Sequence, residues 1–141
     1  MEAPTKLTNL QIVRLANALN SLDGIRLSPT QFEPFQFSPD TSWKIANDIA
    51  VIATHAESYN RAKKQLATQY QVAEGMAITT ENAKSVSDFM GALDGLEQKL
   101  VEISGLEPLS RDKLNVGHDP KKNQNRIPAT VLAALAPILE A

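Results

Sequence analysis

The strongest pattern along the chain is a helix-forming stretch over residues 39–73, which no Gly or Pro interrupts after its first position. Its apolar residues recur in alternating steps of four and three, the spacing of a coiled-coil seam. The seam consists of Ile45, Ile49, Ile52, Ala56, Tyr59, Leu66 and Tyr70, and Lys63 interrupts it. A helix of this length runs about 50 Å, whereas a compact domain of this size is about 37 Å across. We therefore expect an elongated molecule, or a long helix that another chain covers.

A second amphipathic helix is predicted over residues 81–103, with Glu81 in its first turn. Its apolar seam consists of Val86, Phe89, Leu93, Leu96, Leu100 and Ile103. The connection from the first seam is short and contains Gly75, so the two helices are expected to be antiparallel neighbours. The predicted spine of the protein is therefore an antiparallel long helical hairpin.

A short N-terminal helix is predicted over residues 8–23, where Thr8 and Gln11 have the spacing of a capping box. Its apolar face consists of Ile12, Leu15, Leu19 and Leu22. Gly24 is the expected stop, because glycine adopts the left-handed conformation without a steric penalty.

Residues 25–37 predict a small β flap, because Pro29 and Pro34 exclude a helix and the apolar residues favour extended chain. Phe32, Phe35 and Phe37 are concentrated here. A lid on the core is the favoured interpretation, and an aromatic docking surface is the alternative.

The remaining chain is predicted as a polar connector over residues 105–126 and a C-terminal helix over residues 128–139, with Pro137 bending or ending it. A strand within residues 101–109 is expected to pair with the flap. The apolar residues of the last helix either complete the core beside the first helix, which we favour, or dock onto another subunit. The fold class is thus mainly α, in a single domain over residues 1–141.

Composition excludes several classes of function. The net charge of −2 gives no overall attraction to nucleic acid or anionic membranes, and the absence of cysteine excludes disulfides and thiolate sites. No apolar stretch reaches the ~20 residues that cross a bilayer, and residues 1–7 do not have the pattern of a secretory signal. Two basic clusters lack interleaved aromatic residues, so solvated surface is favoured over nucleic-acid binding. The clusters contain Arg61, Lys63 and Lys64, and Lys121, Lys122 and Arg126.

Candidate catalytic groups are few. His55 lies mid-helix with only Asp48 as a further ligand type on its face, which is too little for a metal site, and His118 lies in a turn. No sequence motif of a nucleophile, phosphate-binding loop or metal centre is present. We therefore expect a protein that is not an enzyme and has no cofactor, metal or small-molecule substrate.

Two segments resemble a known group of proteins. Residues 6–24 (KLTNLQIVRLANALNSLDG) and 126–139 (RIPATVLAALAPIL), with a long central helix between them, resemble small, poorly characterised proteins of tailed bacteriophages and prophages. The resemblance implies a virion component or a head or tail assembly factor, located in the virion or the host cytoplasm. It supplies no active-site residues.

The predicted function is thus a non-enzymatic phage structural or assembly protein that contacts other phage proteins or itself. The alternative is a small helical regulator or inhibitor of a host protein or nucleic acid. The residues predicted to contact partners are Phe32, Phe35, Phe37, Trp43, Tyr59, Tyr70, Val131, Leu132, Leu135 and Ile138.

Overall fold

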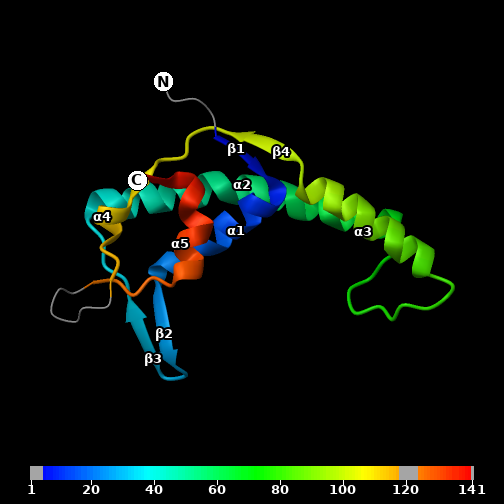
Figure 1. Ribbon diagram of the computed structural model, residues 1–141, viewed down its shortest axis with the longest axis horizontal. Helices are drawn as coiled ribbons and strands as arrows, with labels where there is room; N and C mark the ends of the chain where they lie inside the picture. Colours follow the sequence, from blue (N-terminus) through cyan, green and yellow to red (C-terminus); the bar gives the residue numbers. More distant parts are fainter. Residues whose placement is uncertain (1–4, 118–123, 141) are drawn as a thin grey trace.

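A single continuous helix dominates the structure. The computed structural model describes residues 5–117 and 124–140, and within it α2 (Pro39–Gln69) runs unbroken for 31 residues, about 46 Å. Ser38 caps its start by accepting a hydrogen bond from the backbone N–H of Thr41 at 3.2 Å. Gln71 ends it in the left-handed conformation (φ 56°), close to the predicted boundary. The molecule is mainly helical and elongated along this helix, as the sequence predicts (Figure 1).

The core forms around α1 (Asn9–Asn20), which packs against both α2 and α5 (Ala129–Leu135). The capping box is present: Thr8 Oγ1 accepts from the N–H of Gln11 at 3.1 Å, and the N–H of Thr8 donates to Gln11 Oε1 at 2.9 Å. The 3₁₀ turn η1 (Ser21–Asp23) follows α1. All four apolar residues predicted for this face are buried: Ile12, Leu15, Leu19 and Leu22.

Within the described residues the strands form three two-stranded sheets. Strand β2 (Gly24–Ser28) pairs antiparallel with β3 (Gln31–Pro34), which agrees with the predicted flap. Strand β1 (Thr5–Thr8) pairs antiparallel with β4 (Leu100–Ile103), and β5 (Leu109–Ser110) pairs parallel with β6 (Leu139–Glu140). The expectation that residues 101–109 pair with the flap is therefore wrong, since β4 instead pairs with the strand that precedes α1.

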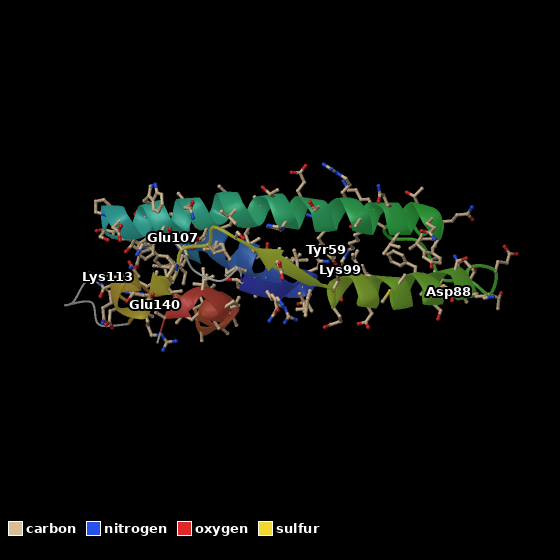
Figure 2. The ribbon with its side chains drawn as sticks, turned by 90° about the horizontal axis from the view of Figure 1, so that it is seen from above. Tyr59, Asp88, Lys99, Glu107, Lys113 and Glu140 are labelled. Atoms are coloured by element: carbon tan, nitrogen blue, oxygen red, sulfur yellow. The ribbon has the colours of Figure 1, made fainter. Side chains whose placement is uncertain are left out.

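The helix predicted over residues 81–103 is shorter than expected. Helix α3 (Ala83–Glu97) ends where the side chain of Asn9 donates to the carbonyl of Leu96 at 2.8 Å. Beyond it, Val101 and Ile103 turn inward while Leu100 stays 63% exposed, which is strand alternation rather than a helical seam. In both views α3 lies alongside the second half of α2 (Figures 1 and 2).

The region predicted as a polar connector contributes to the core. It contains β5 and the short helix α4 (Arg111–Leu114), and both Leu109 and Leu114 are buried. At the C-terminus, α5 gives way to a 3₁₀ turn, η3 (Ala136–Ile138), at Pro137. Leu135 and Ile138 are buried in the core, which is the interpretation that the sequence favoured for this segment.

Candidate interaction surface

The most distinctive surface is the end of the molecule beyond Tyr59, which we call the arm and define as residues 60–97. It comprises the distal part of α2, the connection over residues 70–82 and helix α3 (Figure 2). We call the rest of the described chain the body. Phe89 is the one residue of the arm that is buried, whereas the body contains the other core residues. Two helices therefore extend from the body with little core of their own.

The contact between the two helices of the arm is thin. Tyr59 and Phe89 are 6% and 8% exposed, but the other seam positions are only half-buried. These half-buried positions are Leu66, Tyr70, Val86, Leu93 and Leu96. Where the arm meets the body, the hydroxyl of Tyr59 donates to Glu97 Oε1 at a long 3.5 Å. Burial raises the pKa of the Tyr59 hydroxyl, and the neighbouring Glu97 carboxylate raises it further.

A groove of about 790 Å³ runs along one flank of the arm. Its apolar lining comes from three segments, with Ala67 on α2, Val72 after the end of α2, and Phe89 on α3. Its polar lining consists of Asn60, Lys63, Lys64, Thr68 and Glu74. The groove is thus a concave apolar strip with a mainly cationic margin along α2.

Charge is separated between the two helices of the arm. On α2, Arg61 is paired with Glu57 at 3.1 Å, whereas Lys63 and Lys64 are exposed and make no ion pair within the described part of the chain. Helix α3 carries Asp88, Asp94 and Glu97 against the single cation Lys84. The α2 side of the groove therefore presents two unpaired positive charges.

A buried carboxylate fixes the connection between β4 and β5 onto α2. Asp48 is 0% exposed, and its Oδ1 accepts from the backbone N–H of Glu107 at 2.7 Å. The adjacent Asn47 donates to Asp48 Oδ1 at 3.4 Å and to the carbonyl of Gly105 at 2.9 Å. Asp48 Oδ2 is buried and has no hydrogen-bond partner among the described residues. Burial raises the pKa of Asp48 to about 6, opposed mainly by the hydrogen bond from Glu107.

No protein-family model, curated protein or solved structure matches this chain. The resemblance to phage proteins stays a prediction. None of the described helices is both long and apolar enough to cross a membrane.

The structure divides the residues predicted to contact partners into three groups. Phe32 and Trp43 are 45% and 59% exposed, on the flap and at the start of α2. The half-buried members are Phe37, Tyr70, Val131 and Leu132. Four others are buried within the chain, so they offer a partner little surface in this structure: Phe35, Tyr59, Leu135 and Ile138. Which of the ten residues contact a partner stays a prediction.

Sequence reasoning missed part of the exposed apolar surface. Met90 and Ile78, both on the arm, are 58% and 69% exposed, and Leu27 projects from the flap. Met90 follows the seam residue Phe89 and shares a helix face with Val86 four positions earlier. That four-residue spacing is the signal in the sequence that places Met90 on the side of α3 next to the seam.

The remaining candidate groups form no catalytic constellation within residues 5–117 and 124–140. His55 is half-buried on α2, and no cluster of three metal-ligating side chains occurs in that part of the chain. Arg126 lies 3.8 Å from Glu33, an ion pair between the C-terminal region and the flap. His118, Lys121 and Lys122 lie outside the described residues.

Proposed function

We propose that this protein is a non-enzymatic structural or assembly component of a tailed bacteriophage, acting through protein–protein contacts in the virion or in the host cytoplasm. The observation that supports this function best is the arm, whose apolar seam is only half covered by the chain itself. The resemblance of residues 6–24 and 126–139 to phage proteins supplies the biological setting.

The arm acts in this proposal as an antiparallel helical hairpin that a partner completes. Short helices owe most of their stability to tertiary packing rather than to their own hydrogen bonds. Helix α3 has 15 residues and buries only Phe89, so this chain provides little of that packing. A partner lying on the half-buried seam would remove further apolar area from water, at roughly 25 cal/mol per Å².

Exposed apolar residues outside the arm extend the proposed binding surface. Trp43 and Phe32 are large exposed aromatic side chains, a type that is enriched at protein–protein interfaces. The Arg26 guanidinium lies 5.7 Å from the centre of the Phe32 ring, which combines charge and aromatic area at the flap. These positions are proposed as secondary contacts.

The function is tested in the phage or prophage that encodes the chain. Deleting the gene should yield incomplete heads or tails under electron microscopy, and mass spectrometry of purified particles then separates a virion component from an assembly factor. A deletion that leaves particle number and morphology normal, together with absence of the protein from particles, would refute the proposal. That result would instead favour the regulator alternative.

A matched pair of variants separates binding from folding. Met90→Glu places a charge on the exposed apolar side of α3, whereas Lys84→Glu places the same side chain at an exposed position on another face of the same helix. Both should melt like the parent protein, because neither site is buried. Particle assembly should fail with Met90→Glu and persist with Lys84→Glu.

A further inference from the structure

The groove on the arm has a feature that packing within this chain does not explain. Lys63 takes a place where the seam of α2 would otherwise have an apolar residue, and it lines the groove together with Lys64. Neither ammonium group has an ion-pair partner in the described part of the chain. The groove therefore has two cations beside an apolar strip, and Glu74 is the one carboxylate residue that also lines it.

We propose that this groove binds an acidic amphipathic helix of a partner protein. The apolar face of that helix would cover the half-buried Ala67 and Val72 and the small exposed part of Phe89, and its carboxylates would pair with Lys63 and Lys64. The inference rests on the proposed function, because it names the class of partner that the arm receives.

A helix fits this site better than an extended segment does. The groove lies on the flank of two helices, where a third helix packs its side-chain ridges between theirs. Its α2 lining extends from Asn60 to Thr68, about 12 Å at 1.5 Å per residue, which matches two to three turns of a bound helix. None of the residues that line the groove belongs to a strand, so the site lacks the free strand edge on which strand addition depends.

The charge of the groove favours an acidic partner over a basic one, and over a second copy that presents its own α2. The rim contains Glu74 besides the two lysines, which leaves a net positive margin on the α2 side. If two copies met with α2 against α2, Lys63 and Lys64 would face their own equivalents, and like charges held opposite each other are unfavourable. An acidic helix meets no such repulsion there.

The test uses the full chain and synthetic peptides of about 15 residues, near the length at which helices become stable. The acidic peptide carries leucine on one helical face and glutamate on the other. The basic peptide replaces each glutamate with lysine, and a scrambled acidic peptide keeps the composition without the amphipathic pattern. Binding is measured by fluorescence anisotropy of labelled peptides at low salt, where charge pairs are screened least.

The acidic peptide should bind the parent protein at least about tenfold more tightly than either comparison peptide. The double variant Lys63→Glu, Lys64→Glu should lose about tenfold in affinity for the acidic peptide and gain affinity for the basic one. Lys84→Glu removes one cation from an exposed position of α3 that does not line the groove, and it should bind like the parent.

The double variant is expected to lose affinity for the acidic peptide and to gain affinity for the basic one. This pattern distinguishes a change of charge from misfolding, because a misfolded variant would bind neither peptide specifically. Equal binding of the acidic and scrambled peptides, or no change on reversing the lysines, would overturn the inference. A concentration-dependent dimer of the parent that the lysine reversal either strengthens or weakens would overturn it as well, in favour of a second copy. The Met90→Glu phage separates this inference from the proposed function. If its particles are defective while any of these results is obtained, the proposed function is retained and only the acidic helix is rejected as the partner.

Discussion

Replacing Asp48 with asparagine should change how stability depends on pH. The pKa of Asp48 rises from 3.8 to about 6 in the folded protein, because the carboxylate is removed from water. The folded protein therefore holds a proton at Asp48 in a pH range where the unfolded chain has released it. The stabilising effect of that proton is complete below about pH 4 and is lost as the pH rises through 6.

The magnitude follows from the size of the shift. A shift of about two pKa units corresponds to roughly 3 kcal/mol, at 1.36 kcal/mol per unit. The amide introduced by Asp48→Asn would stay neutral at every pH and would keep an oxygen to accept the hydrogen bond from Glu107. Its nitrogen would replace the unpartnered Asp48 Oδ2, at a cost that does not vary with pH. The stability of Asp48→Asn relative to the parent should therefore rise by up to about 3 kcal/mol between pH 4 and pH 7.

Urea unfolding followed by circular dichroism at pH 4, 5, 6 and 7 measures this difference directly. The other carboxylates titrate in both proteins, so their effects cancel in the comparison. Asp94→Asn, on an exposed residue of the arm, provides the matched control for replacing one carboxylate with an amide. If the stability difference between Asp48→Asn and the parent did not change with pH, the account of Asp48 as a buried carboxyl group with a raised pKa would be wrong.

Further predictions concern the stability of the two ends of the molecule. Gly91→Ala and Gly95→Ala should each stabilise α3 by up to about 1 kcal/mol, because an added Cβ meets no atom within 4 Å. Amide hydrogen exchange in α3 should become slower in both variants, and an unchanged exchange rate would contradict the prediction. Leu93→Asp should remove the protection of α3 from exchange, since it places an unpaired charge in the seam, and a variant that melts like the parent would mean that the seam assignment is wrong. Thr8→Ala should lower the free energy of unfolding by about 1 kcal/mol through loss of the capping box with Gln11, a change that chemical denaturation can resolve.

Local interactions account for the parts of the fold that the sequence predicted well. The capping box of α1 and the start of α2 depend on residues three positions apart, so a short stretch of sequence is enough to predict them. Strand β4 could not be found in this way, because Val101 and Ile103 fit a helical seam and a strand equally well. The decisive partner of β4 is β1, nearly a hundred residues earlier in the chain.

The candidate site was predictable only in outline. Lys63 stood out as an interruption of the seam, but the groove beside it requires Val72 and Phe89 to come together after α2 ends. Asp48 likewise looks like an ordinary helix carboxylate until the backbone of Glu107 packs over it. The sequence favoured a core position beside the first helix for the C-terminal segment, and Leu135 and Ile138 are buried in that core.

Because α2 belongs to both the body and the arm, the two ends are mechanically joined by one stiff element without a hinge. A force applied at the tip reaches the core as a torque on the turns that carry Ile45 and Ile52, with the remaining length of the helix as the lever. In the proposed assembly, a small displacement of a partner bound to the arm would therefore rotate the body through an angle instead of being absorbed by bending.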